Sequence, residues 1–428
     1  MFKIDISQHI NILKKYQNYK VEYDINQFNC SVSRIIRSIR EKKHSELLKF
    51  WNQRSLIDTF ELEHPYYNFI KTRAVKNFHK GIINCVLMID ENKKNPWIFM
   101  QIIDKAMNGF VTKEQFVWFA GNSVQERSCV DFLLQVLKKN EEIDNLNKSF
   151  SFLMNTDRPF PFFVTIANNF LFLKNKKLKN QKIFFDFEDA YENNNSVAIY
   201  PGTLHPEILD YNTMPIFNYV YQKSLLRKKF LINDAKKYQL KIWLGIPGER
   251  REWINWEYDI ILLLLELLRY FQSIQIYLDG LTSLNGVKEF FLENENICNK
   301  LNEYFKINKL RCNFFSVAGC DYATKVSYCS NVDMAISDIG TTVLIPINFC
   351  QKRTVLFGLK KQFSIEFSTY YQKFIKDLNL KVNDFLYIKS NKEHSSWYFI
   401  NSFYIPWQHI YNLTAEVLEE LSAAGKLK

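Results

Sequence analysis

The chain has 428 residues, a length that fits two domains of roughly 200 residues better than one core. With 47% hydrophobic and 16% aromatic residues, it can bury two substantial cores. The net charge of +11 favours an anionic partner, such as a phosphorylated substrate or an acidic membrane surface. There is no long basic tail and no recognisable RNA-binding signature, so we do not expect nucleic acid to be a partner.

The first half of the chain has uneven periodicity, which predicts mixed α/β structure. Apolar residues at helical spacing on a charged background predict a helix over residues 31–51 and another over residues 129–137. Short apolar and β-branched runs predict strands between them and after them. These predicted strands cover residues 81–89, 115–120, 149–154, 182–187 and 197–200.

The second half alternates strands with helices through short loops, which is typical of βαβ units and predicts a parallel sheet. The right-handed crossover rule places every strand-to-helix loop at one edge of that sheet, where ligands of open α/β sheets bind. The predicted strands cover residues 240–246, 273–278, 311–317, 332–337 and 353–357. The predicted helices cover residues 252–271, 284–305, 322–329 and 342–349.

The loop after the first of these strands reads GIPGERR and is suited to an anion. Gly245 and Gly248 allow close approach of the backbone, and the following helix N-terminus attracts negative charge. Arg250 and Arg251 add guanidinium groups that suit a diphosphate. The loop is neither a Walker motif nor a GxGxxG fingerprint, which disfavours an ATPase or a dinucleotide dehydrogenase. The alternative is that the glycines only shape the turn and the arginines are solvated.

The loop after the fourth strand reads SDIGTT and offers groups that can hold a phosphate or a ribose. Ser337 ends the strand, and Gly340 precedes Thr341 and Thr342 at a helix start, so backbone amides and two hydroxyls are present. An ordinary helix N-cap is the alternative, because Ser, Asp and Thr are favoured there. We expect this loop to face the GIPGERR loop across the sheet edge.

Two more strand ends carry candidate ligand-binding residues. Asp279 ends the second strand beside Gly280, where its carboxylate can contact a ribose or sugar hydroxyl or cap a turn. Gly319 ends the third strand, where a nucleobase lies in a Rossmann-like half-site. With the two loops above, these residues define a predicted donor-binding edge.

This organisation resembles the GT-B class of nucleotide-sugar glycosyltransferases, which have two Rossmann-like domains facing a cleft. The resemblance depends on the division near residue 236, the strand-loop-helix at 245–253, the segment 333–346 and the C-terminal tail. It implies an acceptor-side α/β domain over residues 1–235, a nucleotide-sugar-binding domain over 236–405, and a C-terminal helix in 406–428 that packs back on the N-terminal domain.

The resemblance also implies an activity. A sugar would pass from a nucleotide-sugar donor to a hydroxyl of a glycan or glycolipid acceptor in bacterial surface polysaccharide or lipooligosaccharide synthesis. The paired arginines and paired threonines would hold the donor phosphates, with no cofactor and no essential metal. An inverting enzyme needs a base for the acceptor hydroxyl, and Asp157 and His205 are the candidates. Such acceptors lie at the anionic inner face of the cell membrane, which basic residues favour.

Other features place the protein in the cytoplasm, touching a membrane only peripherally. The eight cysteines form no CxxC pair and no zinc-like spacing, which favours a reducing compartment. The N-terminal residues lack the apolar core of a signal peptide. The most apolar run, residues 260–268, is interrupted by Glu266 and is shorter than the ~20 residues that span a bilayer.

Two alternatives remain open. One is a sialyltransferase-like enzyme that uses a CMP-sugar, for which Thr341 and Thr342 would be the paired hydroxyl motif. Against it, His205 and Pro206 precede the acidic segment at Asp279 instead of following it. The other is a non-catalytic, transferase-like binding partner in a surface-polysaccharide assembly.

Overall fold

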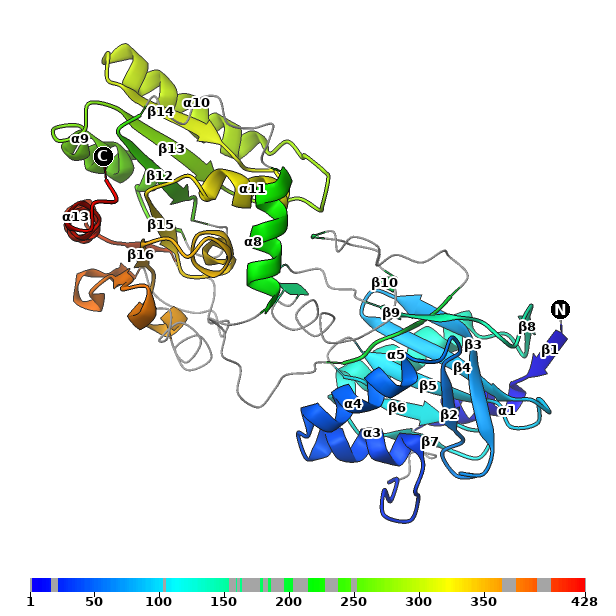
Figure 1. The fold of residues 1–428 in the computed structure, drawn as a ribbon. Coiled ribbons are helices and arrows are strands. Elements are labelled where there is room, and N and C mark those ends of the chain that lie inside the picture. The colour runs from blue at the N-terminus through cyan, green and yellow to red at the C-terminus, as the bar shows by residue number, and fades with distance from the viewer. Residues whose placement is uncertain are drawn as a thin grey trace. The chain divides into compact units, whose positions relative to one another are not determined.

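The computed structural model of the chain falls into two compact units (Figure 1). The first unit comprises Met1–Lys182 and Phe187–Leu209, and the second comprises Ile183–Asp186 and Asp210–Lys428. The residues that the structure describes are 2–16, 22–102, 105–153, 159, 162–163, 178–179, 184–185, 196–202, 215–227, 238–247, 252–363, 375–390 and 402–427. Among them, no helix combines the length and the apolar character needed to cross a membrane.

An antiparallel sheet forms the centre of the first unit. Its strands follow the chain order β2-β3-β4-β5-β6-β7, and each pairs with the next. They are β2 (Glu61–Glu63), β3 (Lys71–Lys80), β4 (Ile83–Asp90), β5 (Trp97–Ile102), β6 (Gly109–Val111) and β7 (Phe116–Trp118). Smaller sheets pair β1 (Phe2–Asp5) with β8 (Asn140–Ile143), and β9 (Phe150–Leu153) with β10 (Leu178–Lys179) and β11 (Val197–Ile199).

Both faces of this sheet are covered, because every residue of β4 and β5 is buried. On one face, Cys85 and Leu87 belong to a core with Cys129 and Leu133 of α5 (Ser123–Val136) and Leu13 of α1 (Ser7–Lys14). Aromatic rings fill the other part of the interior and pack edge to face or stacked. These rings are Trp51, Phe60, Trp97, Phe99, Phe110, Phe150 and Phe152.

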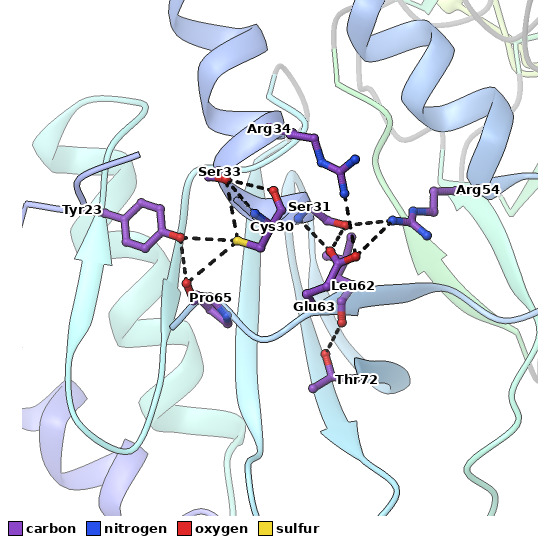
Figure 2. A network of polar contacts seen from close by, with 10 residues as sticks. All are labelled: Tyr23, Cys30, Ser31, Ser33, Arg34, Arg54, Leu62, Glu63, Pro65 and Thr72. Carbon is purple, nitrogen blue, oxygen red and sulfur yellow. Dashed lines mark hydrogen bonds and ion pairs between the residues drawn. The ribbon is translucent and has the colours of Figure 1, made fainter. Parts of the chain in front are cut away.

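The helix predicted over residues 31–51 is two helices, α3 (Ser31–Arg40) and α4 (His44–Arg54). The chain turns between them at Lys42, whose φ of 55° is incompatible with a continuous helix. The start of α3 is held by Glu63 of β2, which accepts a hydrogen bond of 2.7 Å from the Ser31 amide (Figure 2). Arg54 donates to the Ser31 hydroxyl, which joins α4 to the same network. A carboxylate at a helix N-terminus is favourable because of the helix dipole.

The prediction of a Rossmann-like N-terminal domain is wrong for the described residues, since the main sheet is an antiparallel meander. The predicted strands at 81–89, 115–120, 149–154 and 197–200 are confirmed as β4, β7, β9 and β11, and the helix at 129–137 is confirmed as part of α5. Of the strand predicted at 182–187, only residues 184–185 are described.

The second unit is built on a parallel sheet with the order β14-β13-β12-β15-β16-β17. Numbered along the chain, this is the 3-2-1-4-5-6 order of the Rossmann fold. The strands are β12 (Leu240–Gly245), β13 (Ile274–Asp279), β14 (Cys312–Ser316), β15 (Met334–Asp338), β16 (Thr354–Phe357) and β17 (Lys381–Val382). All five strands predicted for this half are confirmed.

Helices cover both faces of this sheet (Figure 1). Leu240, Ile242 and Leu244 of β12 form a core with one set of helices, while Tyr277 and Tyr328 pack together on the other face. The first set is α9 (Trp256–Leu267), α10 (Leu292–Ile307) and α13 (Trp407–Ala423). The other face carries α8 (Pro215–Arg227), α11 (Tyr322–Cys329), the 3₁₀ helix η4 (Thr341–Leu344) and the π-helical turn η5 (Ile345–Phe349). The remaining elements are η6 (Lys360–Phe363), η7 (Phe385–Tyr387), β18 (Lys389–Ser390) and β19 (Phe403–Tyr404).

The C-terminal helix α13 packs its buried residues Ile410, Val417 and Leu421 into the core of the second unit. The apolar face of α13 is therefore buried within that unit. Helix α8 also belongs there, because the Ser327 hydroxyl of α11 donates to the Ser224 carbonyl at 2.8 Å. The division of the chain consequently precedes α8, upstream of the boundary predicted near residue 236.

Candidate functional site

The strand order reverses between β12 and β15, which are neighbours in the sheet. Leu244 pairs with Ile336, so the next residues, Gly245 and Ser337, lie side by side at the carboxyl ends of these strands. A Cβ atom on Gly245 would lie 3.0 Å from Ser337 Oγ. Ligands of doubly wound folds bind in the crevice at this switch point. The structure therefore brings the two predicted loops together at their starting residues.

The loop after β12 is anchored on both sides of its centre. The Ile246 amide donates to the Asp279 carbonyl at 2.8 Å, which ties the loop start to the end of β13. Downstream, Ile254 donates to the Phe403 carbonyl at 2.7 Å, and Phe403 donates to the Glu252 carbonyl at 2.8 Å. Gly248, Arg250 and Arg251 at the loop centre lie outside the described residues, as do Asp157 and His205 of the first unit.

The two threonines of the loop after β15 differ in their hydrogen bonds and in their exposure to solvent. Thr342 donates its hydroxyl to the buried Asp338 side chain, with 2.6 Å between Thr342 Oγ1 and Asp338 Oδ1. That hydrogen is used inside the loop and is not available to a phosphate oxygen, which can only accept. Thr341 is exposed at the first position of η4. Gly340 has extended backbone, and the amides of Thr341 and Thr342 precede the first hydrogen bond of η4, which the Val343 amide donates to the Gly340 carbonyl at 3.4 Å.

Asp279 is engaged in a buried ion pair. Lys325 of α11 donates to Asp279 Oδ1 at 2.6 Å, and the two side chains are 0% and 2% exposed. The same ammonium group donates to the Gly280 and Leu281 carbonyls at 2.9 and 3.0 Å and to Thr282 Oγ1 at 2.8 Å. Burial raises the pKa of Asp279, and the charge of Lys325 opposes that rise. Asp279 therefore fixes the loop after β13 and does not present a free carboxylate.

Lys325 is a residue of this edge that the sequence did not predict. It lies on a short helix, where a lysine is ordinarily placed on the solvent face. Its partner is 46 residues earlier in the chain. No local pattern relates the two positions, so no signal in the sequence could have indicated the pair.

Gly319 shapes the same edge through its backbone. Its φ is +73°, its amide donates to the Leu281 carbonyl at 2.8 Å, and its carbonyl accepts from Glu289 at 2.9 Å. A Cβ atom here would collide with the Glu289 carbonyl oxygen. Asp321 adds a second link, because it caps α11 at Thr324 and also accepts from the Gly286 amide at 2.8 Å. These contacts hold the long connection between β13 and α10 against the segment that follows β14.

The start of α9 contains a carboxyl group in an apolar setting. Asp259 is buried and accepts a hydrogen bond of 3.0 Å from the indole Nε1 of Trp253, which is also buried. Burial raises the pKa of Asp259 to about 6. The folded protein therefore binds this proton more tightly than the unfolded chain, and stability is lost as the pH rises through 6.

Replacing Asp259 with asparagine should raise the free energy of unfolding at pH 7 by about 1–3 kcal/mol, because the amide keeps the acceptor for Trp253 and removes the buried charge. At pH 4 the wild-type carboxyl is largely protonated, so the two proteins should be nearly equal in stability. Urea unfolding at both pH values measures the difference. A gain that is the same at pH 4 and pH 7 would contradict this explanation.

The structure thus defines a mixed α/β protein whose second unit has a Rossmann-like sheet with its switch point between β12 and β15. No family model matches the sequence, and no curated protein matches it. Among solved structures, the chain is similar to the ADP-heptose lipopolysaccharide heptosyltransferase II of E. coli, at 11% identity with a TM-score of 0.31. That alignment covers 51% of this chain and 57% of the heptosyltransferase.

A second similar structure is TarM, at 11% identity with a TM-score of 0.20, covering 89% of this chain and 91% of TarM. The chain spans little more than half the length of the heptosyltransferase. At TM-scores this low, neither likeness supports a functional conclusion.

Proposed function

We propose that the second unit binds a nucleotide-sugar donor at the β12–β15 edge, and that the protein transfers the sugar to a hydroxyl of a glycan or glycolipid acceptor. The observation that carries the proposal is the contact between Gly245 and Ser337 at the switch point of a 3-2-1-4-5-6 sheet.

Bacterial surface polysaccharide or lipooligosaccharide synthesis is the proposed setting. The net charge of +11 favours the anionic inner face of the cell membrane, and absence of co-sedimentation with acidic liposomes at low salt would count against this location.

Within this proposal, the donor phosphates approach the sheet edge where Gly245 has no side chain. Arg250 and Arg251 supply guanidinium groups for the diphosphate. On the β15 side, the exposed hydroxyl of Thr341 and the first amides of η4 supply neutral donors. Thr342 supports the loop through Asp338. The geometry thus supports different roles for the two threonines.

The chemistry of transfer is proposed to need a base in the first unit, with no cofactor and no essential metal. Asp157 and His205 remain the candidates, since a carboxylate or an imidazole can take the proton of the acceptor hydroxyl.

A second candidate function is nucleotide binding without catalysis. Asp279 favours it, because this predicted ligand-binding carboxylate is held by Lys325 inside the protein. A thermal-shift panel of UDP, GDP, CMP and ADP tests binding by either kind of protein. A nucleotide at 100 times its Kd should stabilise the folded state by about 2.7 kcal/mol. Stabilisation by none of the four would contradict both candidates.

Turnover separates the two candidates once a nucleotide has been identified. Phosphorus NMR of the matching nucleotide-sugars, with a membrane extract as acceptor source, should show release of the free nucleotide if the protein is a transferase. Binding without release in the presence of the extract would favour the non-catalytic alternative.

The two threonines provide a matched pair of variants. Thr341→Ala should weaken nucleotide affinity several-fold while leaving stability within about 0.5 kcal/mol, because the side chain is exposed. Thr342→Ala should lower stability by about 1 kcal/mol through loss of its hydrogen bond to Asp338. Titration calorimetry and urea unfolding measure the two effects. Unchanged nucleotide affinity in Thr341→Ala would remove this residue from the site.

A further inference from the structure

The first unit contains a cavity of about 570 Å³ at one end of its antiparallel sheet. Two connections line it, residues 64–70 between β2 and β3 and residues 91–96 between β4 and β5. They lie together because Thr72 at the start of β3 pairs with Asp90 at the end of β4. The cavity is within the roughly 300–1,000 Å³ of small-molecule sites. Its lining includes Phe69, Lys71, Arg73, Asp90, Asn92 and Asn95.

An exposed aromatic ring forms one wall of this cavity. Phe69 is 80% exposed, although it lies on a closed loop in which His64 donates to the Ile70 carbonyl at 2.9 Å and Ile70 to the Tyr67 carbonyl at 2.8 Å. The Phe69 ring contacts Tyr67 at a centroid distance of 6.3 Å, and Tyr67 stacks on the buried His64 at 4.8 Å. The ring is therefore an exposed apolar surface on a loop that its own backbone hydrogen bonds close.

Polar side chains on an ordered turn form the opposite wall. The buried Asp90 accepts from the Asn95 amide at 2.8 Å, and its carbonyl accepts from the Lys93 amide at 3.0 Å. This turn presents Asn92, which is exposed, and Asn95, which is partly exposed, to the cavity. An amide side chain offers both a donor and an acceptor, so it can satisfy a hydroxyl in either sense.

The four charged residues that line the cavity are Lys71, Arg73, Asp90 and Glu91, two of each sign. Arg73 lies 3.9 Å from Glu91 and also pairs at 2.8 Å with Glu61, which is outside the lining. A lining with equal numbers of both signs favours neither an anion nor a cation. A neutral ligand with many hydroxyl groups and one apolar face fits this lining best.

We propose that this cavity binds a neutral sugar residue of a glycan chain, with the apolar C–H face of the sugar on Phe69 and its hydroxyls on the Asp90–Asn95 turn. A pyranose has both kinds of surface, and an aromatic ring favours contact with its C–H groups over contact with water. The site goes beyond the proposed donor-binding edge, because it needs no nucleotide and no transfer step.

Saturation-transfer NMR with glucose, galactose, mannose and N-acetylglucosamine as separate probes tests this site. At least one sugar should receive saturation from the wild-type protein. Phe69→Ala and Asn92→Ala should each weaken that binding about tenfold or more. Phe290→Ala is the matched control, because Phe290 is 74% exposed in the second unit and should have no effect. Both substituted rings are exposed, so unchanged melting temperatures should accompany all three variants.

Saturation of none of the four sugars would overturn the proposal, and so would equal binding by wild type, Phe69→Ala and Asn92→Ala. The outcome is distinguishable from failure of the donor site. Nucleotide stabilisation should persist in Phe69→Ala, while sugar saturation should persist in Thr341→Ala.

Discussion

Replacing Lys325 with methionine should lower the free energy of unfolding of the second unit by about 3–5 kcal/mol. The substitution leaves the carboxylate of Asp279 buried without the ammonium group that lies 2.6 Å away. It also removes the donor to the Gly280 and Leu281 carbonyls, so the loop after β13 loses its attachment to α11. Urea unfolding followed by tryptophan fluorescence measures the change, since Trp243 lies within β12 of the same unit.

The double variant Lys325→Met with Asp279→Leu serves as the control. Removing both partners eliminates the uncompensated charge, so a large part of the lost stability should return. The loss in Lys325→Met alone should also shrink at pH 4, because the isolated carboxyl can then be protonated. A loss below about 1 kcal/mol in the single variant, or a greater loss in the double variant, would contradict the buried pair as described.

Replacing Gly319 with alanine should lower stability by about 2–5 kcal/mol. The residue has φ of +73°, which costs an alanine roughly 1–2 kcal/mol, and the new Cβ would collide with the carbonyl oxygen of Glu289. Relief of that collision requires the β13–α10 connection to move away from the sheet edge. Chemical denaturation compares the variant with the wild type.

Comparison with Gly286→Ala separates the effect of the collision at Gly319 from the effect of backbone strain. Gly286 has nearly the same φ, +72°, but a Cβ there would meet nothing within 4 Å. This variant should therefore lose only about 1–2 kcal/mol. Equal losses at Gly319 and Gly286 would mean that backbone strain alone accounts for the effect, and the packing described at Gly319 would be incorrect.

The second unit could be predicted well because each of its elements has its own local signal. Its strands are apolar runs bounded by glycine or polar loops, and helix 322–329 was predicted with the bounds of α11. The crossover rule then fixed which ends of the strands share an edge. The position of β15 beside β12 does not follow from these local signals, since strand order depends on packing between distant segments.

The antiparallel pairing of the strands in the first unit was not predicted, and the reason is physical. Antiparallel strands usually alternate between apolar and polar residues because one face is solvated. Here β4 and β5 are buried on both faces, so their central residues, 85–89 and 97–100, are apolar runs without alternation, like those of parallel strands. The hairpin between β3 and β4 has only Gly81, with φ of 57°, as a turn signal.

The candidate site was only partly predictable from sequence. Gly245 and Ser337 could be placed at strand ends, and the structure brings them together. The roles of Thr342 and Asp279 depend on Asp338 and Lys325, whose side chains meet them only in the folded state. The sequence alone could not place the C-terminal helix, because an apolar stripe specifies that a helix is covered but not which core covers it.

Hydrogen exchange with and without the stabilising nucleotide most directly tests whether the β12–β15 edge is the donor site. Amides of residues 246–252 and 338–343 should exchange more slowly in the complex, because both loops would be held by the phosphates. The cavity of the first unit, including residues 64–70 and 91–96, should be unaffected. Nucleotide-dependent protection that spares both loops at the edge, or that appears only in the first unit, would contradict nucleotide binding at this edge.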